Sequence, residues 1–116
     1  MRYEEWNVEN AKSLKGAKLC LYFLDASAAL RIQNSPVVLI CPGGAYAETS
    51  DREAETVALQ FAAMGYHAAV LRYSVAPAAY PAALLELGKS VLLLRGHAEE
   101  WNVQPDGLVL AGFSAG

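Results

Sequence analysis

A short apolar run that never alternates with polar residues constrains this sequence most. Residues 36–41 read Pro-Val-Val-Leu-Ile-Cys. A strand with one face in water alternates apolar and polar side chains, whereas a continuous apolar run is typical of a strand covered on both faces of a parallel sheet. The run stops at Pro42, Gly43 and Gly44, residues that a strand interior does not tolerate. The sequence is therefore expected to form a sheet with helices on both sides.

The rest of the chain alternates between strand and helix patterns. Further strands are predicted over residues 18–24, 67–73 and 108–111, and a short one near residues 29–33. A first helix is expected to begin at a capping box of Ser50 and Glu53 and to end before Gly65, which adopts positive φ readily. A second is expected from Pro81 to near Trp101. Its buried stripe is expected at the helically spaced residues Leu84, Leu87, Val91, Leu94 and Ala98.

Two segments carry no regular pattern. Residues 1–17 are mixed and polar and are expected to form an irregular N-terminal arm. Residues 104–107, Gln-Pro-Asp-Gly, are expected to form a turn. The alternation of strands and helices over 116 residues predicts one α/β domain at residues 1–116, with a mostly parallel sheet and right-handed crossovers.

Composition argues against several classes of protein. Hydrophobic residues make up 54 % of the chain, and the net charge is −3 without any basic run, so we expect no nucleic-acid partner. No apolar stretch approaches the roughly 20 residues that span a bilayer, and the first residues do not resemble a signal peptide. We therefore expect a cytoplasmic protein without a membrane partner. Cys20 and Cys41 are expected to be buried free thiols, and without metal-ligand spacing we expect neither metal nor cofactor.

Residues 112–116, Gly-Phe-Ser-Ala-Gly, have the spacing of a nucleophile elbow. A nucleophilic serine must project from a sharp strand-to-helix turn, which forces strained backbone angles on Ser114 and brings Gly112 and Gly116 into contact. Both flanking residues must therefore be very small. The pattern follows the predicted strand at residues 108–111, as this turn requires. The alternative is a serine that only caps a helix.

A second glycine-bearing segment follows the strand at residues 36–41. Acyl-transfer enzymes stabilise a developing oxyanion with backbone N–H groups, one from a loop at this place and one from the residue after the nucleophile. Gly43 and Gly44 let the backbone approach a substrate closely. Both glycine segments follow strands of a parallel sheet, so we expect them at the edge where ligands bind in open α/β sheets. The alternative is a simple turn.

Residues 37–116 resemble the α/β-hydrolase superfamily, and within it the esterase and lipase group that includes acetyl esterases and acetylxylan-esterase-like carbohydrate esterases. The matching segments are Cys-Pro-Gly-Gly-Ala-Tyr at 41–46, Arg-Glu-Ala-Glu at 52–55, Gly-Tyr at 65–66, Leu-Arg-Tyr-Ser at 71–74, Tyr-Pro-Ala-Ala at 80–83 and Gly-Phe-Ser-Ala-Gly at 112–116. The resemblance implies that the chain is the N-terminal part of an α/β-hydrolase fold and reaches only as far as the elbow.

The resemblance also implies roles for individual groups. Ser114 would be the nucleophile, and the backbone N–H groups of Gly44, Ala45 and Ala115 would form the oxyanion hole. The family usually has a third glycine where this chain has Ala45, and a Cβ there would narrow the acyl pocket or shift the loop. The family order is serine, acid, histidine. The acid and the histidine would both follow Gly116, so we expect residues 1–116 to be inactive alone.

Other polar residues receive supporting roles. His67 is expected at the sheet edge opposite the site and His97 near a helix end, both solvated or capping, so neither is expected to be the catalytic base. Arg72 and Tyr73, at the carboxyl end of a strand, are candidates to line the site. Three carboxylates are expected to be first-turn charges favoured by the helix dipole, namely Asp51, Glu53 and Glu55.

These features predict a serine-dependent carboxylic-ester hydrolase that acts on small acyl esters, with acetylated sugars as the candidate substrate by resemblance. Two alternatives remain. A peptidase or amidase of the same superfamily shares the elbow, and a non-catalytic half-domain would bind an anion and pair with another chain. The outer edge of the strand at residues 108–111 is expected to be apolar and unpaired, which predicts self-association of the isolated chain.

Overall fold

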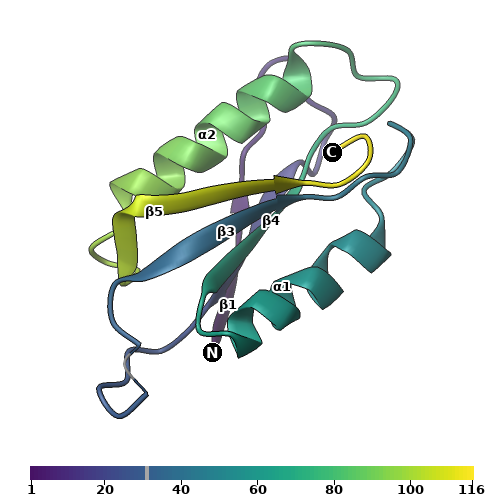
Figure 1. Cartoon of the computed structure of the whole chain (residues 1–116). Coiled ribbons are helices and arrows are strands. Elements are labelled where there is room, and N and C mark those ends of the chain that lie inside the picture. The colour runs from purple at the N-terminus through teal and green to yellow at the C-terminus, as the bar shows by residue number, and fades with distance from the viewer. Residues whose placement is uncertain (31) are drawn as a thin grey trace.

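A five-stranded sheet lies between two helices, α1 on one face and α2 on the other (Figure 1). The computed structural model describes residues 1–30 and 32–116. The elements are β1 (Arg2–Asn7), β2 (Lys18–Phe23), β3 (Ser35–Cys41), the 3₁₀ turn η1 (Asp51–Glu53), α1 (Glu55–Ala63), β4 (His67–Arg72), α2 (Ala82–Gly96) and β5 (Val103–Gly112). Within the described part of the chain, neither helix has the length and apolar character needed to cross a bilayer.

The strand order places the ends of two distant strands side by side. The order across the sheet is β1-β2-β4-β3-β5, with β4, β3 and β5 parallel and β1 and β2 added antiparallel at one edge. The α/β class is confirmed. Because β3 and β5 are parallel neighbours, Cys41 lies opposite Gly112 at their carboxyl ends. The segments that follow these two residues therefore start next to each other.

The continuous apolar run in β3 is buried on both faces, as predicted. Val38 and Ile40 pack on the α1 side, and Leu39 packs on the α2 side. The α1-side core is formed by Cys20, Tyr22, Val38, Ile40, Ala54, Ala58, Ala68 and Val70. The α2-side core includes Leu19, Leu21, Leu39, Leu71, Leu94 and Trp101. Alternate residues of each central strand thus contribute to different cores, so every position must be apolar.

Three predicted segments differ from the structure. The prediction of an irregular arm over residues 1–17 is wrong for β1, which pairs with β2 along its whole length. The short strand near residues 29–33 is wrong where it is described, since only an isolated bridge joins Ser27 to Ile32, and residue 31 lies outside the described residues. The turn at residues 104–107 falls inside β5 as a bulge, because Ser35 pairs with Val103 but Val37 pairs with Leu108.

The ends of the two helices follow local chemistry only in part. Gly65 has φ +93°, so it ends the α1 region as predicted. The capping box is wrong: Ser50 makes no side-chain cap, and α1 begins at Glu55 after the 3₁₀ turn. Helix α2 ends at Gly96 rather than near Trp101.

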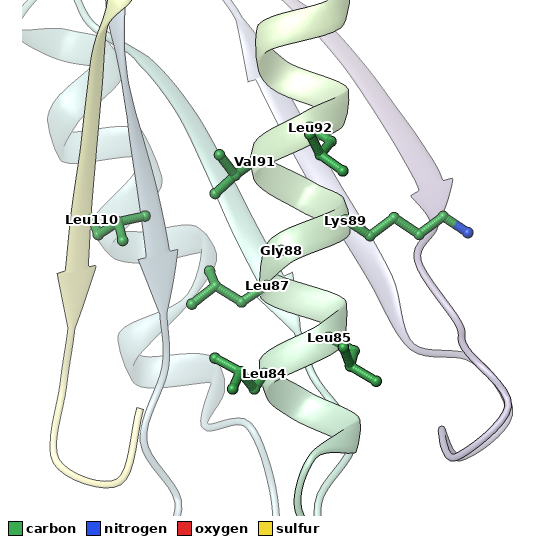
Figure 2. Close-up of a pocket in the computed structure, with 8 residues that line it drawn as sticks. All are labelled: Leu84, Leu85, Leu87, Gly88, Lys89, Val91, Leu92 and Leu110. Atoms are coloured by element: carbon green, nitrogen blue, oxygen red, sulfur yellow. The ribbon is translucent and has the colours of Figure 1, made fainter.

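The predicted stripe of α2 is confirmed except at its first residue. Leu94 and Ala98 are buried, and Leu87 and Val91 pack partly buried against the α2-side core. Leu84 is 54 % exposed, and Leu84, Leu87 and Val91 border an open groove opposite Leu110 of β5 (Figure 2). The apolar pattern did not reveal Glu86 and Ser90, which are polar yet fully buried.

Glu86 is buried because its carboxylate has several partners. It accepts hydrogen bonds from the Ser74 N–H at 2.6 Å, the Ser13 hydroxyl at 2.5 Å and the Ser74 hydroxyl. Ser90 donates its hydroxyl to the Glu86 carbonyl at 2.8 Å. A buried carboxylate is tolerated only when its oxygens are satisfied in this way. The cluster joins α2 to the segments before β2 and after β4.

His67 lies at the start of β4, at the end of the sheet away from Cys41 and Gly112. The prediction of a solvated ring is wrong, because the side chain is completely buried. Its Nδ1 accepts from the Leu24 N–H at 3.0 Å and its Nε2 donates to the Asn102 carbonyl at 2.8 Å. This pairing selects the neutral ring, and burial lowers the pKa of His67 below its ordinary value.

We expect His67 to make the protein less stable in mild acid. The pKa of His67 is lowered in the folded state, so the unfolded chain binds the proton more readily. The free energy of unfolding should therefore fall as the pH drops through about 6.5, the ordinary histidine value, towards the folded pKa. Urea unfolding at pH 7.5, 6.5 and 5.5 should show this slope in the wild type and a flatter one in His67→Gln. Identical slopes in the two proteins would contradict the prediction.

Candidate active site

The residues after β5 form a tight reverse turn with Ser114 at its tip. Phe113 donates its N–H to the Cys41 carbonyl at 3.1 Å, and Gly116 donates its N–H to the Phe113 carbonyl at 2.8 Å. Ser114 is exposed and has φ +52°, in the left-handed region that non-glycine residues occupy at a cost of roughly 1–3 kcal/mol. A helix-capping serine adopts an extended conformation instead. The backbone at Ser114 is therefore that of an elbow rather than of a cap.

Steric crowding explains why glycine stands on each side of the turn, at Gly112 and Gly116. A Cβ on Gly112 would lie 2.7 Å from the Gly116 carbonyl oxygen. A Cβ on Gly116 would lie 2.0 Å from the Cys41 carbonyl oxygen and 2.7 Å from that of Pro42. No side chain fits at either position without moving the backbone. The small-residue requirement that the sequence pattern predicts is thus explained by close backbone packing.

The loop after β3 contacts this turn directly. A Cβ on Gly43 would lie 2.5 Å from the Phe113 carbonyl oxygen and 2.8 Å from Ser114 Cβ. The loop is closed by hydrogen bonds from the Ala47 N–H to the Gly44 carbonyl at 3.0 Å and from the Ser50 N–H to the Gly43 carbonyl at 2.8 Å. The structure therefore brings the two glycine segments together, as expected from their positions after parallel strands.

Three backbone N–H groups near Ser114 have no acceptor. Within residues 1–30 and 32–116, the N–H groups of Gly44, Ala45 and Ala115 donate to no protein atom. They belong to the two segments that meet at Ser114, and they are the groups that the resemblance assigns to an oxyanion hole. Their catalytic role stays a prediction. Unpaired donors beside an exposed hydroxyl are the arrangement that binds a developing negative charge.

An open hollow of about 550 Å³ lies beside Gly44, Ala45 and Ser114. It is lined by Gly44, Ala45, Glu48, Ser50, Arg52, Glu53 and Ser114. Its size is within the range that holds small organic molecules. Polar and apolar atoms both line it.

Ala45 occupies a position that favours glycine. Its φ is +56°, and the next residue, Tyr46, has φ +63°. An Ala45→Gly variant should relieve left-handed strain, so we expect it to be more stable by about 0.5–1 kcal/mol. Urea denaturation, compared with the wild type, measures the effect. A loss of stability would show that the methyl group makes packing contacts that outweigh the strain.

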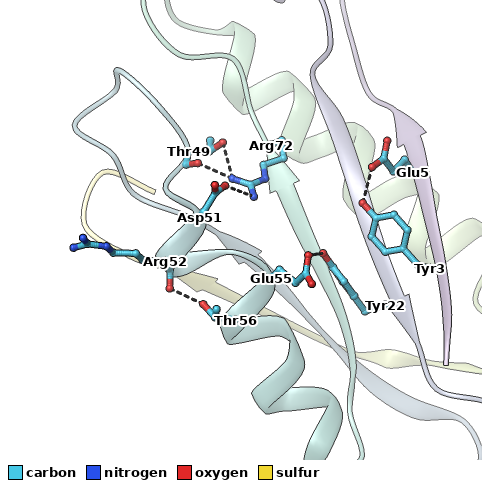
Figure 3. Close-up of polar contacts among 9 residues, drawn as sticks. All are labelled: Tyr3, Glu5, Tyr22, Thr49, Asp51, Arg52, Glu55, Thr56 and Arg72. Atoms are coloured by element: carbon cyan, nitrogen blue, oxygen red, sulfur yellow. Dashed lines mark hydrogen bonds and ion pairs between the residues drawn. The ribbon is translucent and has the colours of Figure 1, made fainter.

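Arg72 binds the loop that forms the hollow (Figure 3). Tyr73 lines a neighbouring pocket together with Ala115 and Gly116 and also binds the loop. Arg72 donates to the Thr49 carbonyl at 2.6 Å, to the Thr49 hydroxyl at 3.2 Å and to Asp51 Oδ1 at 2.9 Å. Tyr73 donates its hydroxyl to the Pro42 carbonyl. Burial, the largest cause, raises the pKa of Tyr73, so the hydroxyl keeps its proton.

The expected first-turn carboxylates also have other partners. Glu53 Oε1 accepts the Gly43 N–H at 3.1 Å, and Glu55 accepts from the Tyr22 hydroxyl at 3.4 Å. Asp51 and Glu53 precede α1, and only Glu55 belongs to its first turn. Asp51 and Glu53 lie instead in the first turn of the 3₁₀ segment η1. Sequence spacing gave no sign of the Glu53–Gly43 contact, because it depends on where the loop folds back.

The histidines and cysteines lie outside this arrangement. His97 stacks on Trp101 with ring centroids 4.4 Å apart and contacts Glu100 at 2.9 Å, while His67 is at the far end of the sheet. Cys20 is a buried free thiol, and Cys41 is half-buried, with its pKa raised by burial. In the described part of the chain, no three His, Cys, Asp or Glu side chains are grouped to hold a metal ion.

Comparison with known proteins decides the family. Residues 25–116 match the family model described as BD-FAE. The chain belongs to the BD-FAE family. The chain is also 31 % identical over 83 residues to endo-1,4-beta-xylanase B of Butyrivibrio fibrisolvens, a match that covers 68 % of this chain and 13 % of that protein.

Solved structures agree with this BD-FAE assignment. MGS-M1, an α/β-hydrolase enzyme from a Medee basin deep-sea metagenome library, matches 100 % of this chain and 48 % of its own at 37 % identity and a TM-score of 0.91. An acetyl ester-xyloside bifunctional hydrolase from Caldicellulosiruptor lactoaceticus matches 85 % of this chain and 35 % of its own, at 33 % identity and a TM-score of 0.79. The BD-FAE chain thus has the α/β-hydrolase fold and esterase relatives. It spans 48 % of the length of the first of these structures and 35 % of the second.

Proposed function

We propose that this BD-FAE chain is the nucleophile-bearing part of a serine carboxylic-ester hydrolase. One observation carries the proposal: exposed Ser114, strained at φ +52°, contacts a glycine loop, and three unpaired backbone N–H groups lie in the two segments that meet there. That combination is what acyl transfer through a serine requires. A binding half-domain has no need for a strained serine at this point.

The proposed reaction uses these groups in two steps. Ser114 Oγ attacks the ester carbonyl carbon as its proton passes to a histidine, and the carbonyl oxygen becomes an oxyanion bound by the N–H groups of Gly44, Ala45 and Ala115. The C–O bond to the alcohol breaks, and the histidine returns the proton to the leaving alcohol. Water then attacks the acyl-enzyme by the same route and releases the acid.

The acid and the histidine are proposed to come from outside residues 1–116. The two histidines of this chain are placed far from Ser114 by the sheet and by α2. A serine without its base is a poor nucleophile, so residues 1–116 alone should hydrolyse p-nitrophenyl acetate no faster than their Ser114→Ala variant. The exposed Val109 and Leu110 of the edge strand β5 should also make this isolated chain self-associate, which light scattering measures.

The proposed substrates are small acyl esters, with acetylated sugars first among them. Two relatives support this choice through their names, the acetyl ester-xyloside bifunctional hydrolase and the xylanase. The open hollow beside Ser114 is lined by several polar side chains that suit a hydroxylated alcohol portion. Peptide amides are expected to be poorer substrates.

The decisive experiment labels Ser114 with a fluorophosphonate in the product of the complete reading frame. We expect one covalent adduct, mapped to Ser114 by mass spectrometry, together with hydrolysis of p-nitrophenyl acetate and acetylated xylan. Ser114→Ala should lose both the adduct and the hydrolysis, whereas Ser27→Ala, in the segment between β2 and β3, should keep both. An adduct or turnover that survives Ser114→Ala would refute the proposal.

A further inference from the structure

The peptide unit that joins Pro42 to Gly43 is bound at both of its polar ends. Its carbonyl, on Pro42, accepts the Tyr73 hydroxyl. Its N–H, on Gly43, donates to Glu53 Oε1 at 3.1 Å. A peptide unit held at both the carbonyl and the N–H cannot rotate without breaking two hydrogen bonds. The next peptide unit, which carries the Gly44 N–H, continues from this fixed unit, and its Gly43 carbonyl accepts the Ser50 N–H at 2.8 Å.

The two side chains that hold this peptide unit are themselves anchored on separate elements. Tyr73 directly follows β4, so its position is set by the sheet. Glu53 ends the 3₁₀ turn η1 and donates its own N–H to the Ser50 carbonyl at 3.1 Å. Arg72 of β4 ties the start of that turn to the sheet through Thr49 and Asp51 (Figure 3).

The loop needs such a hold because its backbone is strained. Ala45 and Tyr46 both have left-handed φ values, +56° and +63°. Residues in this region cost roughly 1–3 kcal/mol each and persist only when the surroundings fix them. With its N–H occupied by Glu53, Gly43 offers no donor to an oxyanion, whereas the N–H groups of Gly44 and Ala45 have no acceptor within residues 1–30 and 32–116.

We propose that Glu53 and Tyr73 are positioning residues that hold the Pro42–Gly43 peptide so that the Gly44 and Ala45 N–H groups face the oxyanion. The proposal rests on the esterase function proposed above and adds two side chains that act through the backbone of the loop. Glu53 acts through the Gly43 N–H and Tyr73 through the Pro42 carbonyl. Their loss should weaken binding of the transition state more than binding of the ester.

The kinetic test compares Glu53→Ala, Glu53→Gln and Tyr73→Phe in the product of the complete reading frame. With rates normalised to serines titrated by a fluorophosphonate, we expect kcat on p-nitrophenyl acetate to fall about 10–50-fold in Glu53→Ala with KM within about twofold. Glu53→Gln keeps an acceptor for the Gly43 N–H and should recover to within about fivefold of the wild type. Tyr73→Phe should fall about 5–20-fold.

Two matched variants control for general damage to the fold. Glu55→Ala removes a carboxylate two residues from Glu53, one that accepts from the Tyr22 hydroxyl, and Tyr22→Phe removes that hydroxyl. Both should keep kcat within about twofold of the wild type. A trifluoromethyl ketone, which forms an oxyanion adduct on serine, should lose affinity in parallel with kcat in Glu53→Ala. Unchanged kcat per titrated serine in Glu53→Ala would overturn the positioning role.

A double variant tests whether Glu53 and Tyr73 act on the same peptide unit. If they do, Glu53→Ala combined with Tyr73→Phe should cost clearly less than the product of the two single losses, because either change already frees the unit. A fully multiplicative loss would overturn this shared action.

Amide exchange separates this inference from the proposed function. The exchange rate of the Gly43 N–H, resolved by mass spectrometry on the complete protein, should rise at least about tenfold in Glu53→Ala and stay unchanged in Glu55→Ala. No change at Gly43 would overturn the hold itself, even in an active enzyme. If the wild type shows no Ser114-dependent turnover, the esterase function and the positioning role are both refuted. This holds whatever amide exchange shows about the hydrogen bond between the Gly43 N–H and Glu53.

Discussion

In the product of the complete reading frame, the Ser114→Gly variant is expected to melt at a higher temperature than the wild type. Its rate of ester hydrolysis is expected to fall by at least about 10⁴-fold. The loss follows because Ser114 is the proposed nucleophile. The gain follows because Ser114 has φ +52°, which glycine adopts without the Cβ penalty. Removing roughly 1 kcal/mol of strain should raise Tm by about 2–4 °C in a domain of 150–250 residues.

The opposite signs distinguish an elbow from a helix cap. A capping serine stabilises its helix, so changing it to glycine leaves stability equal or slightly lower. Ser114→Ala is the matched control: it should lose the same activity but keep the strain, and so show no rise in Tm. Differential scanning calorimetry and p-nitrophenyl acetate hydrolysis on the same three proteins measure both effects. A lower Tm for Ser114→Gly would contradict the elbow interpretation.

Features of the site that arise from local backbone chemistry were predictable from the sequence. Gly112 and Gly116 have no room for a Cβ, and Gly43 meets Ser114 in the same way, so their identities are forced by contacts that recur wherever such a turn forms. The continuous run in β3 is likewise forced by burial on both faces. Constraints of this kind require particular residue types at fixed spacing, and that spacing is visible in a single sequence.

Features that arise from distant partners were not predictable. Strand β1 is polar and mostly exposed, and it is a strand because β2 offers its edge and because Trp6 and Tyr3 pack on Trp101 and Tyr22. From the sequence alone, Glu86 would be assigned to the surface, because its hydrogen-bond partners Ser13 and Ser74 are identified only in the folded structure. No pattern along the chain encodes such partners.

The interactions that set the loop geometry belong to this second class. Glu53 has the right spacing from Ser50 for a capping box, and that local interpretation was wrong because the Gly43 N–H takes its carboxylate. Arg72 and Tyr73 were placed at the correct edge of the sheet, but their partners were not identified. The donors of the candidate oxyanion hole were therefore found by motif, and the groups that hold them only by structure.

Gly116→Ala is expected to lower the free energy of unfolding by about 3 kcal/mol or more and to abolish fluorophosphonate labelling of Ser114. The added methyl carbon would stand 2.0 Å from the Cys41 carbonyl oxygen and 2.7 Å from that of Pro42. Both atoms are backbone, so no side-chain rotation relieves the clash. The turn must move away from the loop, and it would carry the Ala115 N–H with it.

Gly96→Ala is the matched control for that prediction. Gly96 is the last residue of α2 and has a negative φ, and a Cβ added there would meet no atom within 4 Å beyond its own stretch of helix backbone. Alanine at this position should therefore be neutral or stabilise by up to about 1 kcal/mol. Urea unfolding and labelling rates, measured on both variants, separate contact with the β3 loop from the general effect of adding a methyl group. If Gly116→Ala kept wild-type stability and labelling, the elbow would not pack against Cys41, and the loop N–H groups would have no fixed place beside Ser114.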